Sequence, residues 1–396
     1  MSFPMQGIRQ KRVEQFKQLM QKRGLRAILI SGNDNFHFFT NIQLSSHYWE
    51  RPFVLVIPAE GAPFALINKV SENGVLMQVE RQISWISDVS FYSELPRIED
   101  RGYTVVQFTR MLQEKMEAAE LDCGAIGYDS KTAHLSELAT LMPRISLTSV
   151  AADLKPLRWV KHPEEIAILQ AAASLSDWMM TKIKENLKPG RGLQELSAHV
   201  TALGMEEAGR RHPGSNFQIL KLLTLSGPAS SSTDGDGAPT GATLDNNSPI
   251  VCMIVPRMNG YSTEIHRTFF CGKPTADQKA LFETALQLNE SALSQTYAKN
   301  RVSKIDEAVQ MTAFKAGHYK YLVHRAGHGI GISTHEYPED VPFNPRSIQE
   351  NEVFSHEPGL YVKDVGGFRI GDIVVARDKP VVLTSMPKTF ADCTLN

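Results

Sequence analysis

The most informative segment of this chain reads His324-Arg325-Ala326-Gly327-His328-Gly329-Ile330-Gly331-Ile332-Ser333-Thr334-His335-Glu336-Tyr337-Pro338. Two of its histidines, His328 and His335, stand seven residues apart with glycines and small residues around them. A glycine lets the backbone approach a ligand closely because it has no Cβ. Packing alone is a costly explanation for this combination, so the segment predicts a functional loop that presents both histidines.

A β-hairpin is predicted upstream of this loop. Ile250–Val255 and Tyr261–Phe270 are β-rich runs joined by Met258-Asn259-Gly260, and Asn-Gly between two such runs is a strong hairpin signal. Glu264 and His266 lie two residues apart on the returning strand, so their side chains project from the same face. They form a candidate carboxylate–imidazole pair, in which the acid would set the tautomer of His266.

The rest of the chain indicates two domains. Over the first 150 residues strands alternate with helices, which describes an α/β domain. The expected helices are 8–23 and 105–119, and the expected strands are 27–30, 53–57, 63–67 and 125–128, with Ser31-Gly32-Asn33-Asp34 as a turn that closes the first strand. An extended stretch from Leu154 then stops at Pro163, a proline placed for the first turn of a helix. We therefore expect an N-terminal domain over 1–157 and a second domain over 158–396. In the second domain helices are expected at 164–186, 194–208, 276–297 and 304–317, and short strands at 324–331, 352–357, 367–376 and 381–384.

Composition limits the classes of function. Hydrophobic residues make up 42% and charged residues 21% of the 396 residues, which is ordinary for a globular protein. A formal net charge of −1 leaves no basic excess to neutralise a phosphate backbone, so no nucleic-acid partner is expected. No apolar run suits a signal peptide or a membrane span. The four cysteines lie far apart without CxxC spacing, so we expect buried free thiols and a cytoplasmic location.

Four segments together resemble a known family. Gly327-His328-Gly329-Ile330-Gly331, followed by His335-Glu336 and Pro338, closely resembles the signature of the pita-bread hydrolases, which include creatinase, prolidase and aminopeptidase P. Three further segments agree with that family's motifs in order and spacing: Asn259–Phe269, Phe354–Tyr361 and Gly367–Asp372. The resemblance covers nearly all of the chain. It implies an α/β N-terminal domain of the creatinase type followed by an α+β pita-bread catalytic domain.

The metal ligands of this family are only partly present. Its metal-dependent members hold two divalent ions with two aspartates, a histidine and two glutamates. These five positions fall, in chain order, on Met253, Glu264, His328, Glu357 and Gly371, with Asp372 beside the last as a displaced substitute. Two divalent ions about 3.5–4 Å apart need bridging carboxylates, and thioether and glycine supply neither charge nor a hard oxygen. We therefore expect no two-metal site and no cofactor, with a single weakly held divalent ion on Glu264, His328 and Glu357 as the alternative.

Loss of metal has a precedent in creatinase and ectoine hydrolase, so the resemblance implies a metal-independent hydrolase. It would cleave a C–N bond in a small zwitterionic or carboxylate-bearing substrate. Glu357 is the expected group that activates water or shuttles a proton. His328 and His335 are candidates for the general base and for holding the substrate, because imidazole titrates near neutral pH. Glu264 and His266 complete the candidate catalytic set.

The chain departs from creatinase at two places. The loop Thr233–Pro239 has no histidine, and His266 stands where creatinase-like hairpins have an acidic residue before Arg-Thr. Both departures suggest that the proton-transfer histidine has moved from the loop to the strand.

Three residues are expected to contact or orient the substrate. Arg369 is expected to orient Glu357 through an ion pair, and Tyr361 to contribute a hydroxyl. Arg51 belongs to an aromatic and basic cluster at 47–52. In creatinase-like proteins an arginine of this region grips a substrate carboxylate across the dimer interface, so the resemblance implies a homodimer. A surface ion pair is the alternative for Arg51.

Three other functions stay open on the sequence. One is a metal-dependent Xaa-Pro peptidase with a reduced metal site. Another is a C–S or C–O lyase, because the same proton-transfer groups suit an elimination. The last is a non-catalytic binding module on the same fold. The identity of the substrate and of the general-base histidine is also open.

Overall fold

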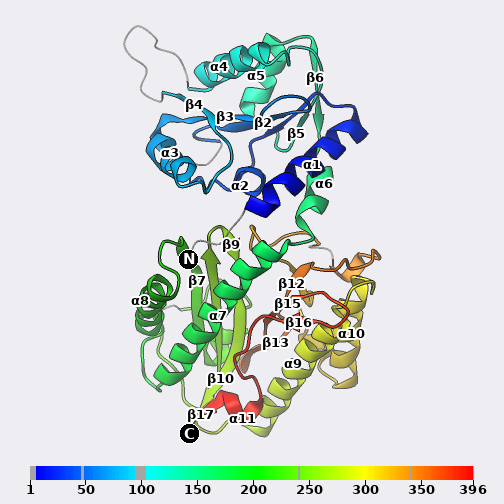
Figure 1. Ribbon diagram of the computed structural model, residues 1–396. Coiled ribbons are helices and arrows are strands. Elements are labelled where there is room, and N and C mark those ends of the chain that lie inside the picture. The colour runs from blue at the N-terminus through cyan, green and yellow to red at the C-terminus, as the bar shows by residue number, and fades with distance from the viewer. Residues whose placement is uncertain (1–5, 46–48, 94–103, 240, 339–340, 396) are drawn as a thin grey trace. The chain divides into compact units, whose positions relative to one another are not determined.

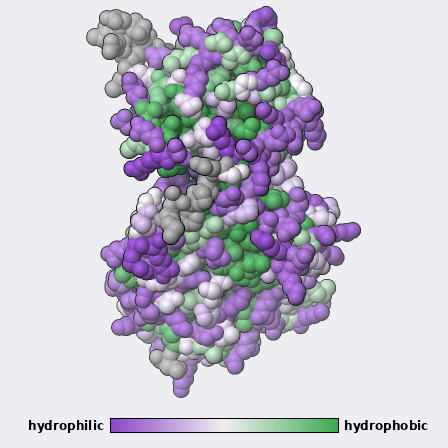
Figure 2. Space-filling model, in the orientation of Figure 1, coloured by the Kyte–Doolittle hydropathy of each residue, from purple (hydrophilic) through white to green (hydrophobic). Residues whose placement is uncertain are grey.

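The computed structural model describes residues 6–45, 49–93, 104–239, 241–338 and 341–395. The chain divides into two compact units, one that ends at Arg158 and one that begins at Trp159 (Figure 1). Taken separately, each unit presents a mostly hydrophilic surface with scattered apolar patches on the face drawn in Figure 2. Over the described residues, no helix combines the length and apolarity needed to cross a membrane. All four cysteines are free thiols, and Cys123 is the one that is partly exposed.

The N-terminal unit is built on a six-stranded sheet with the order β4-β3-β2-β1-β5-β6. Its strands are β1 (Ala27–Ile30), β2 (Val54–Pro58), β3 (Phe64–Asn68), β4 (Asp88–Tyr92), β5 (Gly124–Tyr128) and β6 (Ile145–Ser149). Strand β2 runs antiparallel to both neighbours, and the other pairs are parallel. The helices are α1 (Gln6–Arg23), α2 (Asn33–Thr40), α3 (Glu72–Glu80), α4 (Thr104–Ala118), α5 (Ala133–Leu141) and α6 (Ala151–Leu154). The α/β prediction for this part of the chain is confirmed.

Helix α2 was not predicted, because Ser31-Gly32-Asn33-Asp34 has the composition of a turn. A contact with a residue far along the chain favours a helix here. The Asp129 carboxylate accepts hydrogen bonds from the backbone N–H groups of Ser31 and Gly32, at 2.8 and 3.0 Å. These bonds hold the end of β1 so that the chain enters a helix, whose Phe36 and Phe39 are fully buried.

The C-terminal unit surrounds a sheet with the order β17-β10-β8-β7, in which β9 also pairs with β8. A second sheet has the order β11-β12-β15-β16, and β13 pairs with β14. The longer strands are β7 (Phe217–Ser226), β8 (Pro249–Met258) and β10 (Ile265–Cys271). The shorter ones are β9 (Tyr261–Ser262), β11 (Gly327–Gly329), β12 (Val353–His356), β13 (Gly359–Val362), β14 (Gly366–Arg369), β15 (Asp372–Val375), β16 (Val381–Val382) and β17 (Thr394–Leu395). The helices are α7 (Pro163–Asn186), α8 (Leu193–Arg211), α9 (Ala276–Gln295), α10 (Ser303–Lys315) and α11 (Phe390–Cys393). Helix α7 packs across β8, and α9 lies beside α10 (Figure 1).

The start of the C-terminal unit is held by two kinds of polar contact. One is local in sequence, and the other reaches a residue far along the chain. Pro163 begins α7, and His162 and Glu165 form a reciprocal capping box at its N-terminus. Lys161, just before them, forms a buried ion pair with Glu336 at 2.8 Å. This contact ties the start of the unit to the loop that carries His335.

Two predicted strands are interrupted where the candidate site lies. The returning strand of the hairpin breaks at Thr263 and Glu264, between β9 and β10. The predicted strand 367–376 breaks between β14 and β15, where Gly371 forms an isolated bridge with His266. The first break therefore falls at Glu264, and the second leaves Gly371 opposite His266.

Candidate active site

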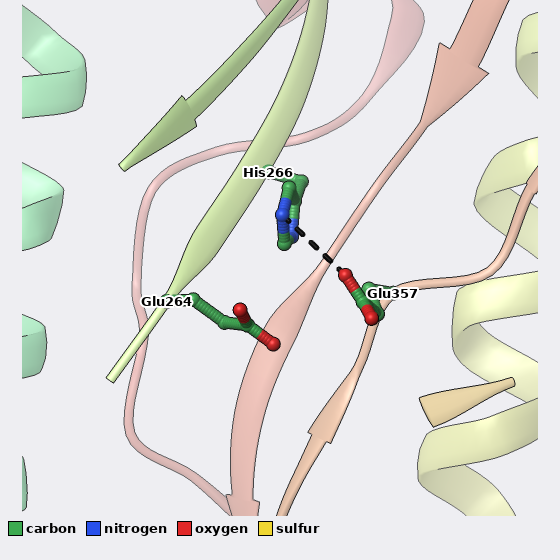
Figure 3. Close-up of side chains that lie close together, drawn as sticks. All are labelled: Glu264, His266 and Glu357. Atoms are coloured by element: carbon green, nitrogen blue, oxygen red, sulfur yellow. Dashed lines mark ion pairs between the residues drawn. The ribbon is translucent and has the colours of Figure 1, made fainter. Parts of the chain in front are cut away.

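Three side chains from separate parts of the C-terminal unit converge at these breaks. Glu264 precedes β10, His266 lies within it, and Glu357 follows β12. Each offers one ligand atom, and these three atoms lie within 4.8 Å of one another. Figure 3 shows the side chains pointing toward one another. Glu264 and Glu357 are 4% and 7% exposed and His266 is fully buried, so the cluster is screened from water.

The glycine-rich segment places His328 beside the same carboxylates. Strand β11 pairs with β12, and a Cβ on Gly327 would lie 2.0 Å from the carbonyl oxygen of Ser355. A residue with a side chain is therefore excluded at 327. Nε2 of His328 lies 3.2 Å from an oxygen of Glu264 and 3.2 Å from an oxygen of Glu357.

The tautomer of His328 follows from its other nitrogen. Nδ1 lies 2.9 Å from the carbonyl oxygen of Gly329, and a carbonyl can only accept. Nδ1 therefore carries a proton, and Nε2 faces the two carboxylates. Nε2 needs either a second proton or a cation between it and the two acids.

Glu264 and His266 were predicted to pair with each other, and this prediction is wrong. Glu264 pairs with His328, and Nε2 of His266 lies 3.5 Å from Oε2 of Glu357. The two residues still face one cluster, but the break at Glu264 displaces its carboxylate from regular strand geometry. The ligand atoms that lie within 4.8 Å of one another belong to Glu264, His266 and Glu357, so this group differs from the predicted set in having His266 in the place of His328.

Burial and neighbouring charges determine the protonation states of His266 and Glu264. Burial, together with the positive charge of Arg369, holds the pKa of His266 well below its ordinary value, so this imidazole is neutral near pH 7. Burial alone would raise the pKa of Glu264, but the neighbouring His328 more than offsets it and the pKa falls. Glu264 is therefore an anion.

Arg369 is the ion-pair partner of Glu357, and it also donates to the carbonyl oxygen of Thr233 at 2.9 Å. This placement matches the orienting contact expected for Arg369. Asp372 does not replace the missing ligand at 371. Its carboxylate pairs with Arg267 at 2.8 Å and Lys388 at 2.7 Å. Burial would raise the pKa of Asp372, but these two cations lower it to about 2.

A cavity of about 690 Å³ opens beside the cluster. Its lining includes Glu264, Glu357, Arg369, His335 and Met253 among the residues singled out from the sequence. It also includes residues to which the sequence assigned no role: Leu220, Lys221, Asp234, Val255, His324, Arg325, Thr334, Pro342 and Phe343. Asp234 belongs to the loop Thr233–Pro239 before the hairpin, and the glycine-rich composition of this loop is the one sequence feature that could have indicated it.

His335 stacks on His328, with ring centroids 3.8 Å apart and an interplanar angle of 17°. Burial lowers the pKa of His335, so the ring is neutral near pH 7. Tyr361, by contrast, is not among the residues that line the cavity. Its hydroxyl lies 3.0 Å from Nε2 of His324, whose Nδ1 donates to the carbonyl oxygen of Arg325. Tyr361 therefore orients His324, and the substrate contact predicted for its hydroxyl stays a prediction.

Arg51 belongs to the N-terminal unit, where its guanidinium pairs with Glu50 at 3.1 Å. Of the predicted cluster, residues 47 and 48 lie outside the described residues. The substrate role of Arg51 stays a prediction.

The C-terminal unit thus places buried acids and imidazoles beside a cavity, an arrangement that suits acid–base chemistry on a bound substrate. The sequence model of metallopeptidase family M24 matches residues 167–378, and that of the creatinase/prolidase N-terminal domain matches residues 12–160. The chain belongs to metallopeptidase family M24. The predicted family and the pita-bread fold are thereby confirmed.

Similar proteins cover almost the whole chain. The putative dipeptidase YkvY of Bacillus subtilis is 27% identical over 95% of this chain and 98% of its own length. The Xaa-Pro dipeptidase of Lactobacillus helveticus is 25% identical over 92% of this chain and 94% of its own. The crystal structure of prolidase from Thermococcus sibiricus shares the fold, with a TM-score of 0.81 and 22% identity. The match covers 98% of this chain and 99% of the prolidase chain. These comparisons confirm a C–N hydrolase and favour the metal-dependent peptidase over the metal-independent hydrolase.

Proposed function

We propose that this protein is a metal-dependent peptidase that uses one divalent ion to cleave a C–N bond in a small peptide of the Xaa-Pro type. The observation that carries the proposal is the convergence of Glu264, His328 and Glu357 beside a cavity of about 690 Å³. The names of the relatives, dipeptidase and Xaa-Pro dipeptidase, support this class of substrate.

The donor set fits one ion and does not fit two. Met253 offers a thioether and Gly371 offers no donor, while the Asp372 carboxylate is engaged by Arg267 and Lys388. Two buried carboxylates balance the charge of one divalent ion. Oε1 of Glu264 and Nε2 of His328 make no hydrogen bond to any described residue, which leaves both atoms available as ligands. Glu264, His328 and Glu357 would therefore hold the ion, which when bound lowers the pKa of water and polarises a carbonyl oxygen.

The protein's own side chains orient the reacting groups. Arg369 orients the Glu357 carboxylate through their ion pair. Nη2 of Arg325 lies 3.4 Å from Nδ1 of His335. A guanidinium can only donate, so the proton of the neutral ring lies on Nε2. His335 can then donate a hydrogen bond to the carbonyl oxygen of the substrate as negative charge develops there.

The cavity suits a short zwitterionic peptide. Lys221 and Arg325 supply positive charge for a terminal carboxylate, and Asp234 supplies negative charge for an amino group. Leu220 and Phe343 provide apolar wall for an uncharged side chain or a proline ring. A homodimer and a cytoplasmic location stay predictions from the sequence.

The test is hydrolysis of an Xaa-Pro dipeptide by protein stripped with a chelator and then supplied with Mn²⁺, Zn²⁺ or Co²⁺. Activity should vanish on stripping, return with an added ion, and stay absent in Glu357→Gln. Glu352→Gln is the matched control, because Glu352 is equally buried and pairs with an arginine, Arg346, at 2.6 Å. That variant should lose stability and keep its activity per folded molecule. Full activity after exhaustive chelation would instead support the metal-independent hydrolase.

A further inference from the structure

The imidazole of His266 occupies the space that a side chain at position 371 would need. His266 and Gly371 exchange backbone hydrogen bonds of 3.2 and 3.0 Å, so their Cα atoms face each other across the bridge. A Cβ built on Gly371 would lie 2.4 Å from Nδ1 of His266 and 3.0 Å from its Cγ. The ring of His266 and a side chain at 371 therefore exclude each other.

The ring is also placed as a ligand that lacks a partner. His266 is fully buried, and neither of its ring nitrogens makes a hydrogen bond to any residue that the structure describes. An unsatisfied buried polar group costs about 1–3 kcal/mol. Nε2 points toward Glu357, at 3.5 Å from its Oε2 (Figure 3). Burying this ring without a partner is costly, so something absent from the protein chain has to satisfy it.

Two side chains beside His266 also carry buried polar atoms that lack a hydrogen bond. Oε1 of Glu264 and Nε2 of His328 are likewise buried without a hydrogen bond among the described residues. Both carboxylates thus face two imidazoles: His328 lies 3.2 Å from each acid, and His266 has a ring nitrogen within 4.8 Å of both. Arg369 already balances the charge of Glu357, and a bound cation would balance the charge of Glu264, which a neutral ligand would not.

We propose that His266 is a ligand of the single divalent ion, in the place of a carboxylate from position 371. The site then consists of two imidazoles and two carboxylates, from His266, His328, Glu264 and Glu357. This inference rests on the proposed metal-dependent function and adds the identity of a ligand to it. Exchange of a carboxylate for an imidazole makes the set neutral with a divalent ion. It also favours Zn²⁺ over Mg²⁺ or Ca²⁺, because imidazole nitrogen suits Zn²⁺ and the harder ions prefer oxygen.

Ion binding to stripped protein tests the inference without any assay of activity. Calorimetric titration of the wild type with Zn²⁺ should give one ion per chain. His266→Ala should weaken binding by roughly 100-fold or more, because loss of even an outer partner of a ligand costs about 10–100-fold. His266→Ala/Gly371→Glu removes the ring and returns a carboxylate from the facing backbone, so it should recover most of the affinity. His134→Ala is the matched control, since His134 is a buried histidine, 2% exposed, in the other unit. It should bind Zn²⁺ as the wild type does.

X-ray absorption of the Zn²⁺-loaded wild type provides a readout that does not depend on a variant folding. Two imidazole ligands are expected, and a spectrum with one would overturn the inference. Zn²⁺ affinity unchanged in His266→Ala would also overturn it, while leaving the metal-dependent function intact. A wild type that binds no ion yet hydrolyses the dipeptide would contradict the proposed function itself. Two ions per chain would contradict the single-ion site.

Discussion

The substitution Gly371→Ala tests the site with a single methyl group. Its Cβ would lie 2.4 Å from Nδ1 of His266, and ordinary van der Waals contact begins at 3.4 Å. The ring must therefore retreat by about 1.0 Å (3.4 − 2.4) or the strand must shift. His266 is fully buried and attached close to the point of contact, so it has little room to move away.

Both activity and stability should fall. A displacement of about 1 Å in a reacting group costs roughly 100-fold in rate, which corresponds to about 2.7 kcal/mol of transition-state stabilisation. An extra methyl group in a packed core costs about 1–3 kcal/mol of unfolding free energy. The substitution lies in the unit that begins at Trp159, and for a unit of that size the loss corresponds to a fall in Tm of roughly 2–4 °C per kcal/mol.

The assay is kcat/KM on an Xaa-Pro dipeptide, together with Zn²⁺ affinity and thermal unfolding. Gly209→Ala is the control, because a Cβ at this exposed position in α8 has no atom within 4 Å. It should keep full activity and gain up to about 1 kcal/mol of stability, since alanine favours a helix. If Gly371→Ala kept the wild-type kcat/KM and Zn²⁺ affinity, the placement of His266 would be irrelevant to the site.

Three further predictions concern the surroundings of the site and the other unit. Glu336→Gln should destabilise the protein by about 3–5 kcal/mol in urea unfolding, because it leaves Lys161 charged and buried, both side chains being 3% exposed. Lys161→Met/Glu336→Leu should lose less than the single variant, and an equal or larger loss would refute this account. Burial lowers the pKa of His134 to about 4, so stability is present above pH 6.5 and falls by up to about 3 kcal/mol as the pH drops toward 4. In His134→Gln that slope should flatten, and an unchanged acid limb would show that other groups cause it. Tyr361→Phe should cost about 1 kcal/mol of stability, because His324 loses its hydroxyl partner, with KM nearly unchanged. A KM that rises ten-fold or more would instead assign Tyr361 to the substrate.

Much of the fold was predictable because its signals are local. The Asn259-Gly260 turn between two β-rich runs predicted the hairpin of β8 with β9 and β10. Pro163 indicated the start of α7, which begins at this proline, one residue before the predicted range 164–186. The glycines around His328 indicated a close approach, and Gly327 does pass against the backbone of β12. Each of these signals depends on a few neighbouring residues, which is why the sequence alone reveals it.

Contacts between distant segments were not predictable in the same way. Helix α2 forms where a turn was expected, because Asp129, which follows β5 almost a hundred residues away, binds the backbone of Ser31 and Gly32. Asp372 stands next to the missing ligand position, yet its carboxylate turns to Arg267 and Lys388. Neither outcome can be predicted from residue type or spacing.

For the protein as a whole, the sequence by itself determined the family, the hairpin, the loop with two histidines and the loss of ligands at Met253 and Gly371. Only the tertiary structure decided how the remaining groups combine. Alternation along one strand places Glu264 and His266 on one face, but a backbone break and the absence of a side chain at Gly371 give them different partners. The physical reason is that a binding site depends on the distances between side chains from separate strands, and these distances are set by packing of the whole unit.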